Sequence, residues 1–199
     1  MFAVLTGAGL SAAAGLNAYI PFLIVGVLAR FTNVINLPGQ WQWIESWWAL
    51  GIGAVLLISE LVLDKIPVVD SINDIAGTVI RPASGGIIAA ATQSASSLDD
   101  SSFMREHTWI GLIGGIVVAG IVHVGKSTAR PAVNLGSAGL GAPIVSTVED
   151  VSSLGLSLIA IFLPLLVIVA LIAGGWVLWK FARRMRSFAR RRRYAEDVT

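Results

Sequence analysis

The segment "DKIPVVDSINDIAGTVIRPASGG", residues 64–86, places charged residues between two highly apolar stretches of the chain. Residues at i, i+4 and i+7 share one face of a helix, so Asp70, Asp74 and Arg81 predict one polar face. Carboxylates beside a guanidinium can form ion pairs, line a solute path or bind an ion. An ionisable side chain in hydrocarbon costs about 2.5 to 3.5 kcal/mol, so this face is expected to meet polar groups or water.

A second, mainly cationic face follows later in the chain, where His123, Lys126 and Arg130 have helical spacing. The carboxylates of the first face are therefore expected to lie against Lys126 or Arg130. This arrangement could be a polar pocket that conducts a solute, or a set of ion pairs that locks helices together. The candidate polar network comprises Asp70, Asp74, Arg81, His123, Lys126, Arg130, Glu149 and Asp150.

The composition indicates a membrane protein. The 199 residues are 55% hydrophobic and 13% charged, whereas soluble domains are about 25% charged. Apolar runs near the roughly 20 residues that cross a bilayer recur along the chain. We predict an all-α polytopic fold with about five spans, the third preceded by a polar turn. The predicted spans are about Phe2 to Leu28, Trp48 to Leu63, Ser71 to Ala91, Trp109 to Val133 and Ser146 to Phe181.

The C-terminal tail carries most of the positive charge. We divide the chain into a helical membrane domain, 1–181, and an Arg-rich tail, 182–199. A basic block beyond a span favours the cytoplasm, and it can bind anionic lipid headgroups. The block gives no reason to expect nucleic-acid binding. The tail arginines are Arg183, Arg184, Arg186, Arg190, Arg191, Arg192 and Arg193.

Five spans with a cytoplasmic C-terminus place the N-terminus outside. Lys65, Lys126, Arg130, Glu149 and Asp150 then fall toward the outer side of the membrane. If the first span is instead broken or re-entrant, the count changes and the N-terminus moves inside.

Two further features concern how the helices pack and begin. Gly111, Gly115 and Ala119 recur at every fourth residue, a pattern that lets membrane helices approach closely. We expect this surface to pack on the preceding span. Ser146 and Glu149 match a capping box, which predicts that the last span begins near Ser146.

Four pieces of the sequence resemble a known family. They are "GLSAAAGLNAYIPFL", "DKIPVVDSINDIAGTVIRP", "VHVGKSTAR" and "GLGAPIVSTVEDVSSLGLSLIAIFLPLL". In order and spacing they are similar to a bacterial membrane family catalogued as domain of unknown function 4126. The resemblance implies a multi-pass protein of the bacterial inner membrane, and it implies no activity.

One segment of the sequence matches a nucleotide-binding pattern. Residues 120–127, "GIVHVGKS", match the phosphate-loop pattern G-x-x-x-x-G-K-S. That chemistry needs a glycine loop between a strand and a helix, whereas this segment ends a long apolar run. We therefore expect no nucleotide site. The sequence also offers no catalytic set, no cofactor site and no metal site, since it has two histidines and no cysteine.

The missing catalytic set favours a non-enzymatic protein. We expect an accessory or structural subunit that packs against a larger membrane complex, such as a respiratory one. The alternative is a transporter or channel for a small solute or ion, with a polar site between the third and fourth spans. The partners expected are the lipid bilayer and other membrane subunits. Glu60, within the second span, could reach the outer interface, pair with a basic residue or bind a proton or ion, and we expect one of the first two.

Overall fold

We describe the fold from a computed structural model of the full chain. The structure describes residues 2–95, 98, 106–137 and 141–196, and within these ranges it contains helices and no strand. The side chains of Asp70 and of the tail from Arg184 onward lie outside the described residues, as do residues 138–140. The predicted all-helical class is confirmed.

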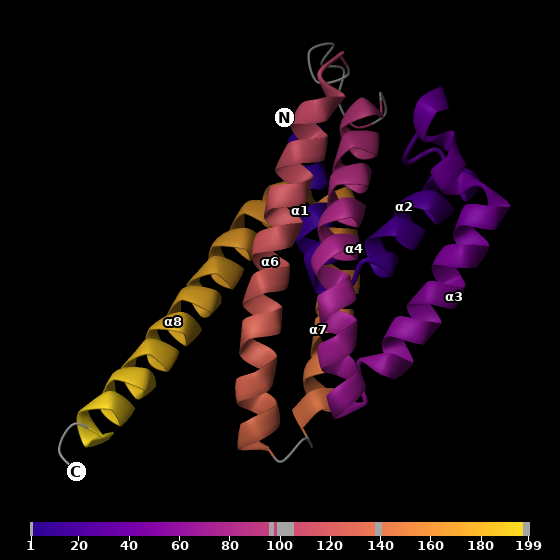
Figure 1. The fold of residues 1–199 in the computed structure, drawn as a ribbon. Coiled ribbons are helices and arrows are strands. Elements are labelled where there is room, and N and C mark those ends of the chain that lie inside the picture. The colour runs from indigo at the N-terminus through magenta and orange to yellow at the C-terminus, as the bar shows by residue number, and fades with distance from the viewer. Residues whose placement is uncertain (1, 96–97, 99–105, 138–140, 197–199) are drawn as a thin grey trace.

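The chain forms a bundle of helices in which two helices diverge from the centre (Figure 1). In order, they are α1 (Phe2–Leu16), α2 (Tyr19–Phe31), the 3-10 helix η1 (Gly39–Glu45), α3 (Trp47–Leu63), α4 (Pro67–Ser94), α6 (Thr108–Gly136), α7 (Gly141–Phe162) and α8 (Pro164–Glu196). Three of these, in α4, α6 and α7, are long and apolar enough to cross a membrane, and the bent pair η1–α3 would make four. A multi-pass membrane protein is thus supported, whereas the predicted five spans are not confirmed.

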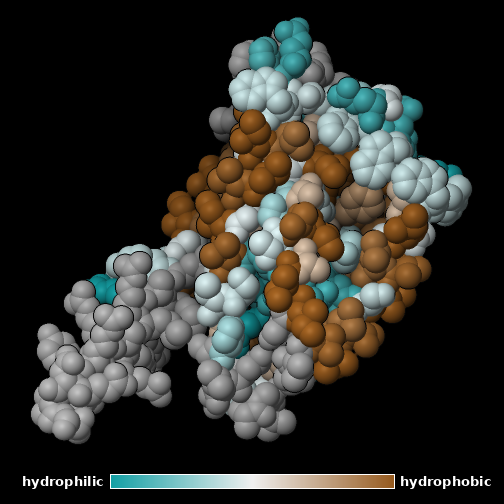
Figure 2. All heavy atoms as spheres, in the orientation of Figure 1, coloured by the Kyte–Doolittle hydropathy of each residue, from teal (hydrophilic) through white to brown (hydrophobic). Residues whose placement is uncertain are grey.

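The surface agrees with a lipid-bilayer environment. Figure 2 shows apolar residues over the middle of the molecule and hydrophilic residues gathered at its upper end. Large apolar side chains such as Ile75, Val79 and Ile121 are mostly exposed on the outer faces of α4 and α6. In water such surfaces would be unfavourable, whereas in lipid they are the expected exterior.

Helices α4 and α6 form the closest pair in the bundle, as the small residues predict. They run antiparallel (Figure 1). A Cβ added at Gly115 would lie 2.5 Å from the carbonyl oxygen of Gly85, and one added at Gly85 would lie 2.5 Å from the Cβ of Ala119. Gly111 similarly faces the side chain of Gln93. The two backbones meet where neither helix carries a bulky side chain.

The first predicted span is wrong, because the chain breaks at Asn17. The side-chain oxygen of Asn17 accepts hydrogen bonds from the amides of Tyr19 and Ile20, at 3.0 and 3.2 Å, and so starts a new helix. Pro21 in the first turn of α2 has no amide hydrogen to satisfy, so it fits this start. Figure 1 shows that α1 enters from the upper end and α2 returns toward it. The two helices therefore form a V whose tip is the break at Asn17.

The last predicted span is also interrupted. Helix α7 ends at Phe162 and Pro164 opens α8, since proline cannot continue the hydrogen bonding of the preceding helix. The predicted capping box is wrong as well. Helix α7 already begins at Gly141, so Ser146 and Glu149 lie inside it, and the glutamate points to the polar interior described below.

The tail and the cationic part of α6 lie toward the same end of the molecule. In Figure 1 the α3–α4 connection, the end of α6 and the start of α7 lie at the lower end, and α8 runs downward. The N-terminus and the end of α2 lie at the upper end. The prediction that Lys126 and Arg130 lie on the side opposite the tail is therefore wrong, because α8 turns back after Leu163.

Candidate functional site

Charged side chains from four helices gather inside the lower half of the bundle. We call this set the buried ionic network. No side chain in it is more than 11% exposed. Its members are Glu60 and Asp64 from the end of α3, Asp74 and Arg81 from α4, His123, Lys126 and Arg130 from α6, and Glu149 from α7.

Asp64 is the residue on which the cations converge. Its Oδ2 atom lies 2.9 Å from Arg130 Nη2, 3.4 Å from Lys126 Nζ and 3.6 Å from Arg81 Nη2. Its other oxygen accepts a hydrogen bond from Asn73 at 2.7 Å. Burial alone would raise the pKa of Asp64, but Lys126 and Arg130 outweigh burial and hold this pKa at about 2. Asp64 is therefore ionised.

Arg81 joins α3 to α4 from the middle of the membrane segment. Its Nη1 atom donates to Asp74 at 2.9 Å, and its Nη2 atom donates to Glu60 at 2.8 Å. The guanidinium folds back along its own helix and lies over Gly77. A Cβ added at Gly77 would come within 3.2 Å of Arg81 Cζ. The glycine thus leaves the room that this conformation needs.

Arg130 and Lys126 join α6 to its neighbours. Arg130 forms a short ion pair with Glu149 and lies 3.7 Å from Asp74. Lys126 lies 3.1 Å from Glu149, and it also donates to the carbonyl of Leu16 at 2.8 Å. That carbonyl ends α1, so the helix break places a backbone acceptor beside the network.

His123 is neutral, because its neighbours fix its tautomer. Arg81 Nη1 lies 2.9 Å from His123 Nδ1, and a guanidinium can only donate, so Nδ1 accepts. The ring proton is then on Nε2, which donates to the Thr78 hydroxyl at 3.3 Å. Thr78 in turn donates to the carbonyl of Asp74 at 3.1 Å.

Asp150 lies beside the network rather than within it. It accepts a hydrogen bond from Asn17 at 2.9 Å, and it lies 4.0 Å from Lys65, whose side chain is 41% exposed. Asn17 therefore has two functions: its oxygen caps α2, and its amide ties the helix break to α7.

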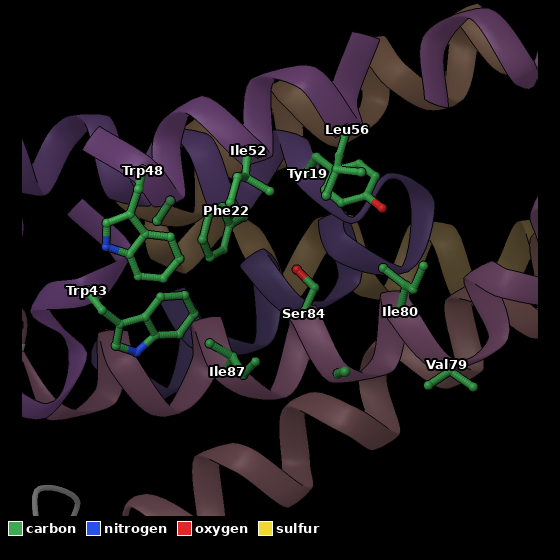
Figure 3. Close-up of a pocket in the computed structure, with 13 residues that line it drawn as sticks. Tyr19, Phe22, Trp43, Trp48, Ile52, Leu56, Val79, Ile80, Ser84 and Ile87 are labelled. Atoms are coloured by element: carbon green, nitrogen blue, oxygen red, sulfur yellow. The ribbon is translucent and has the colours of Figure 1, made fainter. Parts of the chain in front are cut away.

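Two adjoining spaces lie between α2, α3 and α4. The larger is an apolar groove of about 350 Å³, with Trp43 and Trp48 toward one end and Tyr19, Leu56 and Ile80 toward the other (Figure 3). The smaller is a polar cavity of about 10 Å³, which is roughly the space of one water molecule. Its lining includes Tyr19, Glu60, Asn73, Ile80 and Arg81, so Tyr19 and Ile80 border both spaces.

The model of a family described as a domain of unknown function, DUF4126, matches residues 4–184. The chain belongs to the DUF4126 family. This match confirms the family predicted from the four sequence pieces. No curated protein and no solved structure matches the chain.

The structure brings together most of the network predicted for this DUF4126 protein. Asp74 lies against Arg130, as predicted, and each belongs to a different helix. Glu60 pairs with a basic residue, one of the two outcomes expected among the three considered for it. Of the predicted set, Arg81, His123, Lys126 and Glu149 also belong to the network, Asp150 lies at its edge, and the side chain of Asp70 lies outside the described residues.

Sequence reasoning missed the central position of Asp64. The available signal was its spacing from Glu60, since residues four apart share a helix face at the end of α3. The phosphate-loop pattern, residues 120–127, lies within α6 and is helical, so it forms no phosphate-binding loop. Among the described residues, no group of three side chains is placed to hold a metal ion.

Proposed function

We propose that this DUF4126 protein is a membrane transport protein that moves a small polar solute or an ion through the buried ionic network. The observation that carries the proposal is the position of the network, which lies at the tip of the V formed by α1 and α2, between membrane helices. Ionisable residues at membrane depth mark substrate and ion pathways in many transporters. Discontinuous helices supply the binding sites of many transporters.

The helix break supports this proposal through its backbone. The carbonyls of Ala13, Leu16 and Ala18, near the end of α1, accept hydrogen bonds from Ser153, Lys126 and Ser84. Irregular backbone at membrane depth is tolerated where it is buried in protein or lines a polar space. The break is thus held by side chains of three other helices, in an environment that can also accommodate a polar solute.

The Arg-rich tail supports an orientation. Positively charged segments favour the cytoplasmic side, so the tail and the network end of the bundle would face the cytoplasm and the N-terminus would lie outside. In a bacterial inner membrane, the tail would also contact anionic headgroups. Just before the tail, Lys180 lies over Trp176, and within the tail Arg183 lies over Trp179, at 4.9 and 5.3 Å from the ring centroids. Tryptophan rings beside cations are typical of the membrane interface.

Flux measurements test the proposal. The purified protein would be placed in lipid vesicles, and gradients of H⁺, Na⁺, K⁺ and glycine would be imposed in separate experiments. We expect at least one gradient to dissipate faster than in empty vesicles. Asp74→Asn should slow that flux at least tenfold, whereas Glu106→Gln, on an exposed residue outside the network, should not. Equal rates with and without the protein for every gradient would contradict transport.

The divergence of α8 favours a second function, that of an accessory subunit in a larger membrane complex. Helix α8 leaves the bundle (Figure 1), and Val169, Ile172 and Trp176 are more than half exposed along it. A partner's helices could cover this surface. Purification in a mild detergent separates the two proposals: a larger partner in fixed stoichiometry favours the accessory subunit, and a homo-oligomer alone favours transport.

A further inference from the structure

The described side chains of the buried ionic network do not balance in charge. The carboxylates are Glu60, Asp64, Asp74 and Glu149, and the cations are Arg81, Lys126 and Arg130. His123 is neutral, as its hydrogen bonds show. With every carboxylate ionised, the network would hold one uncompensated negative charge. An unpaired buried charge is strongly unfavourable, and such a group takes up a proton instead.

The pairing of the carboxylates points to the one in excess. Asp64 lies 2.9 Å from Arg130, Glu149 lies 3.1 Å from Lys126, and Asp74 lies 2.9 Å from Arg81 and also 3.7 Å from Arg130. One cation can thus be assigned to each of these three carboxylates.

Glu60 is the carboxylate that remains. Its Oε1 atom accepts from Arg81 at 2.8 Å, but Arg81 is shared with Asp74, which in addition lies 3.7 Å from Arg130. Its Oε2 atom is buried and has no hydrogen-bond partner in the described part of the chain. The residue is 5% exposed.

The polar cavity of about 10 Å³ lies beside this residue. Both Glu60 and Arg81 line the cavity, and each carries an unpartnered buried atom, Oε2 of the glutamate and Nε of the arginine. A water molecule fits a space of this size, and it can accept from Nε–H and exchange a proton with Oε2. The cavity therefore provides the proton with a neighbouring acceptor.

We infer that Glu60 carries an exchangeable proton inside the membrane, and that this proton is the coupling ion of the transport proposed above. The role of the proton as coupling ion rests on the proposed function, whereas the presence of the proton on Glu60 does not. When water accepts the proton, one O–H bond of the carboxylic acid breaks and one forms on the water. The carboxylate left behind is then held by Arg81 alone.

The groups around Glu60 agree with a proton that can leave and return. Arg81 from α4 donates to Glu60, Asp64 at the end of the same helix lies 3.4 Å from Lys126 of α6, and Tyr19 from α2 borders the cavity. His123 and Asp74 face the opposite side of the Arg81 guanidinium. Charges of both signs thus surround Glu60. A shift of any of these helices would change the relative stability of its protonated and ionised forms.

Infrared difference spectroscopy of the reconstituted protein tests for the proton. We expect wild type at neutral pH to show the C=O band of a protonated carboxyl, with a shift in D₂O. The band should disappear in Glu60→Gln and persist in Glu106→Gln, a matched change at an exposed site. Absence of the band from wild type, or its persistence in Glu60→Gln, would overturn the inference. The wild-type comparison in H₂O and D₂O requires no variant to fold.

A stability measurement provides a second readout. Glutamine resembles a protonated glutamate, so Glu60→Gln should leave the melting temperature near that of wild type at neutral pH. A loss as large as that of Asp64→Asn would show that Glu60 is ionised and would overturn the inference. In vesicles with a trapped pH dye, Glu60→Gln should abolish proton movement. A carboxyl band without flux of any tested species would contradict the proposed function and leave the proton on Glu60 standing.

Discussion

At the scale of single residues, the network is held by opposite charges that depend on one another. Asp64 has three cations within 3.6 Å, and Arg130 contacts carboxylates on three other helices. Removing one partner of a buried ion pair leaves the other charge uncompensated, which is far more costly than the pair itself is stabilising. Single substitutions and paired substitutions should therefore behave differently.

The first prediction concerns Asp64 and Arg130, which lie 2.9 Å apart. Asp64→Asn and Arg130→Gln should each lower the free energy of unfolding by about 3 to 5 kcal/mol, because each leaves buried charge unpaired. The double variant should lose clearly less than the sum, as expected for residues in contact. Denaturant unfolding in detergent measures all four proteins, with Glu106→Gln as control. Strictly additive losses would show that the two side chains do not interact.

The second prediction concerns pH. The pKa of Asp64 is about 2 in the folded protein and 3.8 ordinarily. Because the folded value is the lower one, the ionised carboxylate stabilises the fold above pH 3.8, and this contribution is lost as the pH falls through about 2. The difference in melting temperature between wild type and Asp64→Asn should be constant from about pH 8 to pH 5 and shrink below about pH 4. A difference that already shrinks near neutral pH would contradict this.

At the scale of helices, the contact between α4 and α6 could be predicted, whereas for the first span the sequence left a continuous and a broken helix open. Small residues at every fourth position give a direct signal of close approach, and Gly115 and Ala119 meet Gly85 as expected. Asn17, in contrast, lies in a continuous apolar run, and its side chain could have bonded across helices instead. Only the packed structure shows that it captures the amides of α2.

The third prediction uses two neighbouring glycines of α6. A Cβ at Gly115 would meet the carbonyl oxygen of Gly85 at 2.5 Å, whereas nothing lies within 4 Å of one at Gly114. Gly115→Leu should therefore separate the two helices and destabilise the protein by about 1 to 3 kcal/mol or more, as overpacking does. Gly114→Leu adds the same volume toward lipid and should cost little. Thermal unfolding in detergent would compare the stability of the two variants. If both variants lost the same stability, Gly115 would not lie in the contact between α4 and α6.

At the scale of the whole molecule, the two ends differ in charge and in structure. The lower end carries the α3–α4 connection and the Arg-rich helix, and the upper end carries the tryptophans of η1. The sequence predicted most members of the network from their helical faces. It did not predict the side of the membrane on which they lie, because this depends on α8 turning back after Leu163.

The fourth prediction concerns orientation. The natural chain has no cysteine, so single cysteines can be labelled without background. A membrane-impermeant maleimide applied to intact cells should label Gln40→Cys at the upper end. It should label Ile66→Cys, in the α3–α4 connection, only after the cells are opened. Both positions are exposed in the structure. The reverse pattern would place the Arg-rich end outside the cell.

Helix α3 is packed against the rest of the protein near both of its ends and borders a groove along its middle. Near its start, Leu50 and Gly53 pack against Gly26 and Leu23 of α2, and at its other end Glu60 and Asp64 are bound to cations. Between these attachments lies the groove of about 350 Å³. Lateral pressure from the surrounding lipid chains would therefore act on α3 where the groove leaves it without support, and bending there would displace Glu60. Changes in bilayer thickness and chain packing would then alter the ion pairs around Glu60.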